Sequence, residues 1–375
     1  MNRAIFRLYL FVVFLLLAFA ANAQDKLPNW ALGPFSRPEN VNPIISPNIE
    51  SVFMDPILKK KIAWEAGDVF NPAAAVHKNK IYVLYRSEDR SGNGIGMRTS
   101  RLGIAESNDG INMKRSPEPV FYPDEDEQKA NEWPGGCEDP RIAVTEEGLY
   151  VMFYTQWNRN IFRLAVATSK DLKHWTKHGP AFNKAYNGKF KDLKCKSGSI
   201  VTKLENGKQI IAKINGKYMM YWGERFMNIA ISTDLVNWEP TLNDKNELDM
   251  IVKPRQHFFD SDLTECGPPA IVTDQGILVL YNGKNRGDDK RDTNYVANTY
   301  SAGQVLFDLK HPSKVIARLD KPFFVPTAPF EKSGQYPSGT VFLEGLVYFK
   351  KQWFLYYGCA DSHVAVAIYD PAPPK

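Results

Sequence analysis

The sequence predicts an all-β fold, a five-bladed β-propeller, because two kinds of repeat run along the chain. A short apolar strand ending in tyrosine recurs about every 60 to 75 residues, at Tyr85, Tyr154, Tyr221, Tyr281 and Tyr357. After the first three copies comes a strand ending in serine and a polar turn that contains Asp109, Asp171 or Asp234. Repeated units of short strands indicate radial repetition, since each unit buries its face only against its neighbours. A β-sandwich is the alternative, but its strands would not recur as five matched pairs.

The first element of the chain, residues 1–23, is predicted to be a secretory signal peptide. Arg3 and Arg7 form a basic start, residues 8–21 are almost wholly apolar, and the small residues Ala21 and Ala23 precede Gln24. This order of basic, apolar and small residues is typical of a cleaved export signal, and the apolar run is short for a membrane span. We therefore expect a periplasmic or secreted protein with no membrane insertion after cleavage.

Three further segments follow the signal peptide. Residues 24–70 are rich in proline and are expected to pack on the propeller or to help close its ring. Residues 71–370 contain the five repeats and form the expected catalytic propeller. Residues 371–375, with three prolines among them, are expected to be a frayed tail.

Composition excludes several classes of protein. Hydrophobic residues make up 43% and charged residues 24% of the chain, as in soluble globular proteins, so disorder and coiled coils are excluded. The formal net charge of +5 is spread among interspersed acidic and basic residues, which gives no footprint for nucleic acid. The four cysteines lie far apart and the six histidines lack metal-ligand spacing. We predict buried free thiols, no metal site and no cofactor.

Polar residues follow the repeated strands that end in tyrosine. Assuming that these strands are the innermost ones, the residues after them would face one central funnel: Arg86, Asp89, Gln156, Glu224 and Asp361, with Trp222 beside them. Carboxylates and amides bind sugar hydroxyls, and aromatic faces cover the apolar side of a sugar ring. This set therefore favours a carbohydrate site. The alternative is that these groups make hydrogen bonds that close the blades.

The densest polar motif is the segment from residue 134 to 142, PGGCEDPRI, which contains Glu138, Asp139 and Arg141. Two adjacent carboxylates between glycines and a proline make a rigid acidic turn, although an ordinary Asx-type turn would have a similar composition. Glu265 occupies a similar place before the strand that ends at Tyr281. A glycosidase needs two carboxyl groups, one to protonate the leaving oxygen and one to activate water.

Several motifs in order resemble glycoside hydrolase family 130, the β-mannoside phosphorylases and β-mannosidases. They are NPA from residue 71, YRSED from 85, SRLG from 100, GGCEDPR from 135, GPP from 267 and YGCAD from 357. The resemblance implies a five-bladed propeller with Asp139 as general acid. It also implies that Asn71, Arg86, Arg101 and Asp361 hold the mannose at the cleaved position. Glu138 and Arg141, in the motif of the acid, are predicted substrate contacts, and His363, close to Asp361, is another.

One departure from this family bears on the reaction. The phosphorylases carry a His-Arg-Pro step after the third repeated strand, whereas this chain has Trp222, Gly223 and Glu224, and they lack a carboxylate at the place of Glu265. Carboxylates repel a phosphate dianion and can activate water instead. The sequence thus favours an inverting β-mannosidase with β-1,2 linkages as its expected substrates and either Glu224 or Glu265 as base. A β-mannoside phosphorylase and a non-catalytic carbohydrate-binding propeller are the alternatives.

Overall fold

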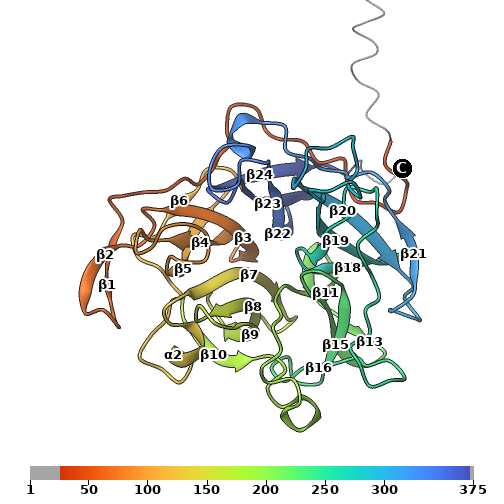
Figure 1. The fold of residues 1–375 in the computed structure, drawn as a ribbon, viewed down its shortest axis with the longest axis horizontal. Coiled ribbons are helices and arrows are strands. Elements are labelled where there is room, and N and C mark those ends of the chain that lie inside the picture. Colours follow the sequence, from red (N-terminus) through yellow and green to blue (C-terminus); the bar gives the residue numbers. More distant parts are fainter. Residues whose placement is uncertain (1–25, 372–375) are drawn as a thin grey trace, which may run out of the picture.

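The computed structural model describes residues 26–371, which form a β-propeller (Figure 1). The expected signal peptide and residues 372–375 of the expected tail lie outside the described residues. Within the described part, no helix is both long and apolar enough to cross a membrane.

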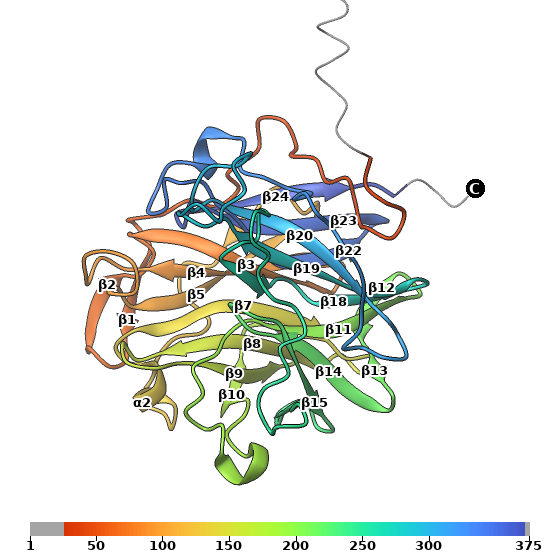
Figure 2. The same ribbon diagram turned by 45° about the vertical axis from the view of Figure 1, so that its right-hand side comes forward.

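The strands form five antiparallel groups arranged around a centre, as the sequence predicts (Figures 1 and 2). The first blade contains β3 (Asp68–His77), β4 (Lys80–Glu88), β5 (Ser100–Ser107) and β6 (Lys114–Arg115). The second contains β7 (Gly136–Val144), β8 (Tyr150–Trp157), β9 (Phe162–Ser169) and β10 (Trp175–Pro180). The third contains β11 (Gly198–Glu205), β12 (Lys208–Ile211), β13 (Lys213–Ile214), β14 (Lys217–Trp222), β15 (Asn228–Ser232) and β16 (Glu239–Pro240). The fourth contains β17 (Leu263–Cys266), β18 (Ala270–Thr273), β19 (Gly276–Lys284), β20 (Tyr300–Phe307) and β21 (Val315–Arg318). The fifth contains β22 (Val341–Phe349), β23 (Gln352–Cys359) and β24 (His363–Tyr369).

The innermost strands are not the ones that the sequence pattern suggested. The strands that end in tyrosine are β4, β8, β14, β19 and β23, and each lies second in its blade. The strand nearest the centre precedes the tyrosine strand of its blade, although β12 and β13 lie between β11 and β14 in the third blade. At the centre β3 contacts both β22 and β7. The assumption that the tyrosine strands line the centre was therefore wrong. Asn71, Asp139 and Glu344 lie on these preceding strands, whereas Arg86, Glu224 and Asp361 lie on the tyrosine strands or just after them.

The repeated tyrosines instead make buried hydrogen bonds that stabilise the blades. In four blades the tyrosine hydroxyl donates to a buried carboxylate at 2.6 to 2.9 Å, in the pairs Tyr85–Glu65, Tyr154–Glu132, Tyr281–Asp260 and Tyr357–Glu331. A cation pairs with each of these carboxylates, namely Arg115, Lys177, Arg318 and Arg37 respectively. The exception is Tyr221, which donates to the carbonyl of Pro312 at 2.9 Å. Buried charges need such partners, so these groups account for much of the sequence repeat.

The repeated polar turns also have a structural role. Ser107, Ser169 and Ser232 each donate a side-chain hydrogen bond to the aspartate two residues later, at 2.7 to 3.1 Å. The same aspartate oxygens accept backbone N–H groups, which fixes the turn before the outermost strand.

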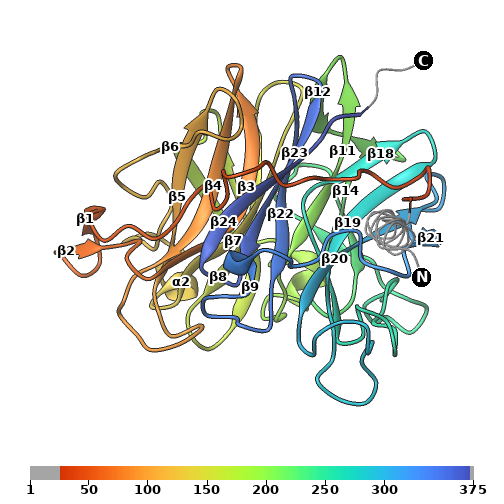
Figure 3. The ribbon, with the colours of Figure 1, turned by 90° about the horizontal axis from the view of Figure 1, so that it is seen from above.

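Residues of the N-terminal segment complete the fifth blade, which has three strands of its own. Ser36 forms an isolated bridge with Ile368, and Ile45 forms another with Val364. Asn42 adds two side-chain hydrogen bonds to the backbone of Val366. In Figure 3 this segment passes β24 and continues toward β1 (Val52–Asp55) and β2 (Lys60–Ala63). Through these contacts residues 36 to 45 pair with β24.

All four cysteines, Cys137, Cys195, Cys266 and Cys359, are buried with free thiols. Burial raises the pKa of each thiol, so none is poised as a thiolate nucleophile.

Candidate active site

Three of the innermost strands break their regular pairing at matching positions and present a polar residue there. The register shifts lie between Phe70 and Pro72 in β3, between Glu138 and Arg141 in β7, and between Leu343 and Gly345 in β22. The polar residues at these bulges are Asn71, Asp139 and Glu344. A β-bulge changes the direction of a side chain, so the three bulges concentrate polar groups near the axis. Asn71 and Asp139 have φ of 47° and 49°, the left-handed conformation that asparagine and aspartate tolerate better than most residues.

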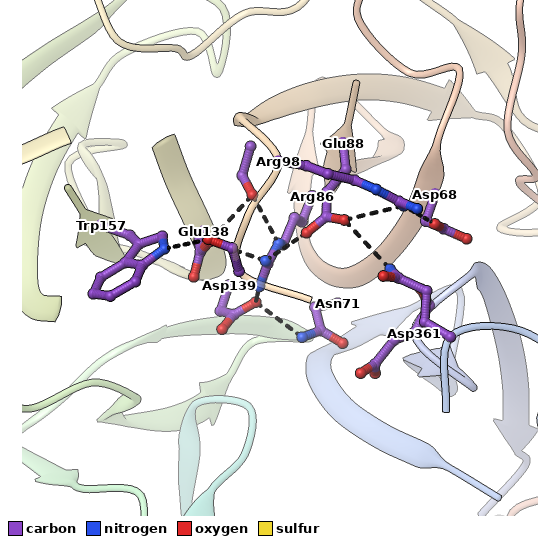
Figure 4. A network of polar contacts seen from close by, with 12 residues as sticks. Asp68, Asn71, Arg86, Glu88, Arg98, Glu138, Asp139, Trp157 and Asp361 are labelled. Atoms are coloured by element: carbon purple, nitrogen blue, oxygen red, sulfur yellow. Dashed lines mark hydrogen bonds and ion pairs between the residues drawn. The ribbon is translucent and has the colours of Figure 1, made fainter. Parts of the chain in front are cut away.

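Arg86 on β4 is the centre of a buried network (Figure 4). Its guanidinium contacts Asp139 at 3.0 Å, Glu138 at 2.9 Å and Glu88 at 2.7 Å. Asn71 donates a second hydrogen bond to the same oxygen of Asp139, at 2.9 Å. Asp139 is thereby held by groups from two strands of the neighbouring blade. This fixed geometry is what a group that transfers a proton requires.

The two adjacent carboxyl groups of β7 titrate in opposite directions. Burial opposes the charge of Asp139, but the positive charges of Arg86 and Lys196 and the hydrogen bond from Asn71 outweigh it and lower its pKa. Burial raises the pKa of Glu138, and the negative charge of Asp139 raises it further against the attraction of Arg86. Two carboxyl groups this close repel each other when both are charged, so their pKa values move apart. Of the two carboxyl groups, Glu138 therefore keeps its proton to the higher pH.

Asp361 lies just beyond β23, on the side of the network where Asn71 lies (Figure 4). Burial and the negative charges of Asp139 and Glu88 raise the pKa of Asp361 to about 7, against the attraction of Arg86. The ring of Tyr336 lies 5.3 Å from that of Tyr300, and the hydroxyls of both interact electrostatically with Asp361. Asp361 thus offers a carboxyl group next to aromatic surface, a combination that suits a sugar ring.

A second group of charges forms where Glu224 and Glu265 meet around Lys196. The ammonium of Lys196 lies 3.2 Å from Oε1 of Glu224 and 3.6 Å from Oε1 of Glu265. Ser197 donates a hydrogen bond to the same oxygen of Glu265. Burial raises the pKa of Glu265, and the negative charge of Glu224 adds to this, while Lys196 opposes it. The two predicted base residues therefore lie together, with a cation between them.

Arg141 links the two groups and holds neighbouring blades together. Its guanidinium donates to the carbonyl oxygens of Asp139, Cys266 and Gly267 at 3.0 to 3.1 Å. It also lies 3.2 Å from Glu344 and 3.8 Å from Glu265. The side chain is 1% exposed, so Arg141, predicted as a substrate contact, is positioned as a support for the residues that face the substrate.

Arg101 and Asp89, both predicted substrate contacts, lie in a different buried cluster. Arg101 pairs with Asp89 at 2.8 Å and with Asp55 of β1 at 2.6 Å. Its guanidinium also lies over the ring of Phe53, 5.5 Å from the ring centroid. These contacts attach the β1–β2 hairpin to the first blade. The contacts of Arg101 point to a structural role at this position.

In the described structure, the contacts of Gln156, Trp222 and His363 are with residues other than Asp139. Gln156 donates to Gln128 and to Glu132 of the short helix α2 (Lys129–Glu132), at 3.1 Å each. Trp222 is 2% exposed and packs in a hydrophobic cluster with Phe182, their ring centroids 4.7 Å apart. His363 contacts Ser46 of the N-terminal segment at 3.1 Å. For these three residues the contacts are those of blade and segment packing.

Sequence reasoning missed Lys196, Glu344, Tyr300 and Tyr336. Lys196 stands in a segment with several other lysines, which hides its special position. Glu344 carried a usable signal, since it is a lone carboxylate within an otherwise apolar strand. It is fully buried, and both of its oxygens lack a hydrogen-bond partner within the described residues.

Comparison with known proteins places this site in a family. A family described as β-1,4-mannooligosaccharide phosphorylase, glycoside hydrolase family 130, matches residues 42–371. A 1,2-β-oligomannan phosphorylase from Thermoanaerobacter sp. (strain X514) is 34% identical over 84% of this chain and 94% of its own length. A β-1,2-mannobiose phosphorylase from the same strain is 33% identical over 85% of this chain and 96% of its own length.

Solved structures are more similar still. A putative glycosidase from Bacteroides thetaiotaomicron VPI-5482 is 62% identical, with a TM-score of 0.92 over 93% of this chain and all of the other. A second structure, 62% identical with a TM-score of 0.92 over 93% of this chain and 97% of its own, is described with glycoside hydrolases of the GH130 family that target β-1,2 mannosidic linkages in Candida mannan. Members of this family are enzymes that act on mannosides, and the predicted resemblance is confirmed. The chain belongs to glycoside hydrolase family 130.

Proposed function

We propose that this protein is an exported β-mannosidase that hydrolyses β-1,2-linked mannosides with inversion at the anomeric carbon. The curated relatives at 33% and 34% identity are phosphorylases. The solved structure described with hydrolases that target β-1,2 linkages is far more similar, at 62% identity. This difference in similarity supports the hydrolytic branch and a β-1,2-linked substrate.

The observation that carries the proposal is the pair Glu224 and Glu265 around Lys196. The single ammonium is shared between two carboxylates at 3.2 and 3.6 Å. Arg141, 3.8 Å from Glu265, is itself paired with Glu344 at 3.2 Å, so the three carboxyl groups outnumber the two cations. A phosphate dianion entering next to this group would meet repulsion, whereas a neutral water molecule would find two acceptors for its protons. The arrangement therefore favours attack by water.

The two groups of charges divide the chemistry between them. Inverting hydrolysis needs one carboxyl group to protonate the leaving oxygen and a second to take a proton from water on the opposite face. The Glu138–Asp139 pair supplies the acid side. Glu265 suits the base, because its raised pKa strengthens it as a proton acceptor while Lys196 favours its charged form. Such a base must lie about 6.5–9.5 Å from the acid to leave room for the water.

Phosphorolysis is the second candidate, and a specific observation favours it too. Lys196 is a cation that interacts electrostatically with Asp139, and phosphorylases bind their anionic nucleophile with such groups. The two curated relatives from Thermoanaerobacter are phosphorylases. Export would favour hydrolysis over phosphorolysis, because an exported phosphorylase would form its sugar phosphate outside the cytoplasm, where metabolism cannot use it directly. Export itself rests on the sequence of residues 1–23.

Product analysis decides between these reactions. The mature protein is incubated with β-1,2-mannobiose and, for comparison, β-1,4-mannobiose, each with and without phosphate. We expect mannose from the β-1,2-linked substrate at a rate that phosphate does not raise, with α-mannose as the first anomer in proton NMR. Mannose 1-phosphate as the main product in phosphate buffer would overturn the proposal in favour of a phosphorylase. A failure to release mannose under any of these conditions would favour a binding protein.

A further inference from the structure

Lys196 brings together parts of the chain that are far apart in sequence. It lies just before β11, Glu224 follows β14, and Glu265 belongs to β17 of the next blade. Its ammonium is 3.2 Å from Glu224 and 3.6 Å from Glu265, and its side chain is 22% exposed. One lysine thus connects both candidate base residues.

The charges around Lys196 explain why both carboxylates need it. Two carboxylates at one site repel each other, which favours a proton on one of them. Burial opposes the charge of Lys196, but Glu265 and Glu224 outweigh it and raise the pKa of the ammonium, with Asp139 and Tyr300 adding to the effect. Lys196 is therefore charged at any pH at which the enzyme works. It compensates the two carboxylates as a permanent cation.

The partners of the two carboxylates differ in number. Glu265 is 1% exposed and is also held by Ser197, with Arg141 at 3.8 Å. Glu224 is 38% exposed, and its ion pair in the described structure is with Lys196. Without Lys196, Glu224 would be free to rotate into solvent, and Glu265 would lose its nearest cation.

We propose that Lys196 is a positioning residue that holds Glu224 and Glu265 around one water site and is itself prevented by these two carboxylates from binding an anionic nucleophile. The proposal rests on the hydrolytic function proposed above. In this view Lys196, Glu224 and Glu265 together favour water over phosphate as the nucleophile, because the two carboxylates neutralise the lysine that would otherwise bind phosphate.

The first test is the pH profile of Lys196→Met, a variant of similar length without the charge. Loss of the cation disfavours the charged carboxylates, so the acidic limb of kcat/KM should move to higher pH. We expect kcat to fall at least tenfold with KM changed less than threefold, since Lys196 acts on the water side. Lys196→Arg keeps the charge and should keep the position of the acidic limb. Lys194→Met, an exposed lysine two residues away, is the matched control and should behave as wild type.

The second test removes the two negative charges beside Lys196. In the double variant Glu224→Gln/Glu265→Gln the ammonium loses both counter-charges, and inorganic phosphate should bind, as measured by calorimetry. With β-1,2-mannobiose, a phosphate oxygen would attack the anomeric carbon, the glycosidic bond would break, and the Glu138–Asp139 pair would protonate the leaving sugar. The product is then mannose 1-phosphate, found only when phosphate is added. Adding Lys196→Met to the double variant should abolish phosphate binding.

The outcomes separate this inference from the proposed function. Wild-type enzyme that hydrolyses mannobiose, together with an unshifted acidic limb in Lys196→Met, overturns the role of Lys196 and leaves the hydrolase intact. Absence of phosphate binding in the double variant overturns the neutralisation of Lys196 by the two carboxylates. Phosphorolysis by the wild type overturns the hydrolytic function itself.

Discussion

Nδ2 of Asn71 donates a hydrogen bond to Oδ1 of Asp139 at 2.9 Å, and each residue stands at a bulge in the innermost strand of its own blade. The same oxygen of Asp139 accepts from Arg86 at 3.0 Å. The first and second blades are thus joined at the residue that the family resemblance assigns as general acid.

Asp139→Asn should lower kcat by roughly 10²–10⁴-fold, because the amide keeps the shape of the side chain but cannot transfer a proton. Substrate affinity should change little, since the amide oxygen can still accept from Asn71 and Arg86. Steady-state kinetics on β-1,2-mannobiose and calorimetric binding measure the two quantities separately. Near-normal turnover on this unactivated substrate would mean that another carboxyl group is the acid.

Glu138→Gln should also lower kcat at neutral pH, by about 10²-fold. The raised pKa of Glu138 lets this residue hold a proton to higher pH than Asp139 does, and a glutamine cannot transfer one. Glu88→Gln is the matched comparison, since Glu88 contacts the same guanidinium at 2.7 Å. We expect a clearly smaller loss there. Equal losses of kcat in the two variants would show that both act by displacing Arg86, and would contradict a role of Glu138 in proton transfer.

Asp361→Asn should change how stability depends on pH. The folded-state pKa of Asp361 is raised to about 7, so between pH 4 and 7 the folded protein retains a proton that the unfolded chain has lost. The stability that this proton contributes is fully present below pH 4 and is lost as pH rises through 7. Asparagine does not titrate and tolerates the φ of 51°. The melting temperature of the variant relative to wild type should therefore rise steadily from pH 4 to pH 8. A difference that does not vary with pH would contradict the raised pKa.

Tyr281→Phe should destabilise the fold more than Tyr221→Phe. The hydroxyl of Tyr281 donates to Asp260 at 2.6 Å and accepts from Arg318 at 3.1 Å, so its loss removes hydrogen bonds to charged groups, worth about 1.5–3 kcal/mol. Tyr221 donates to the neutral carbonyl of Pro312, and its loss should cost about 0.5–1.5 kcal/mol. Urea unfolding of both variants measures the two costs. A larger loss of unfolding free energy in Tyr221→Phe than in Tyr281→Phe would show that the tyrosine–carboxylate hydrogen bonds do not explain the repeated tyrosines.

Sequence reasoning reached the number of blades because repeats report on local strands and turns. It failed to place those strands relative to the axis, because the tyrosines that made the pattern visible serve the interior of each blade. The strand β3, which contacts β22 and β7, contains Ala73, Ala74 and Ala75, whose small side chains give a weak pattern. A strong periodic signal therefore marked the second strand of each blade and not the first.

The candidate site was predicted in part for a related reason. Glu138 and Asp139 stood out as neighbours in an unusual motif, and Glu224 and Glu265 stood out against the expected family pattern. Lys196 belongs to a lysine-rich segment, and only the fold brings it between two carboxylates. Conversely, Trp222 was selected for its type, but an indole packs equally well in a core, where its ring contacts Phe182.

The bridges from Ser36 to Ile368 and from Ile45 to Val364 have a consequence for how the chain folds. The segment that leaves the ribosome among the first completes the blade that is made last, so its pairing partners appear only when synthesis is nearly finished. Contacts of such long sequence separation are slow to form. Until then the fifth blade has an unpaired edge strand, the kind of surface that recruits other chains. Ring closure is therefore expected to be a late step after synthesis, and a chain that has lost the residues around Ser36 would keep an aggregation-prone edge at β24.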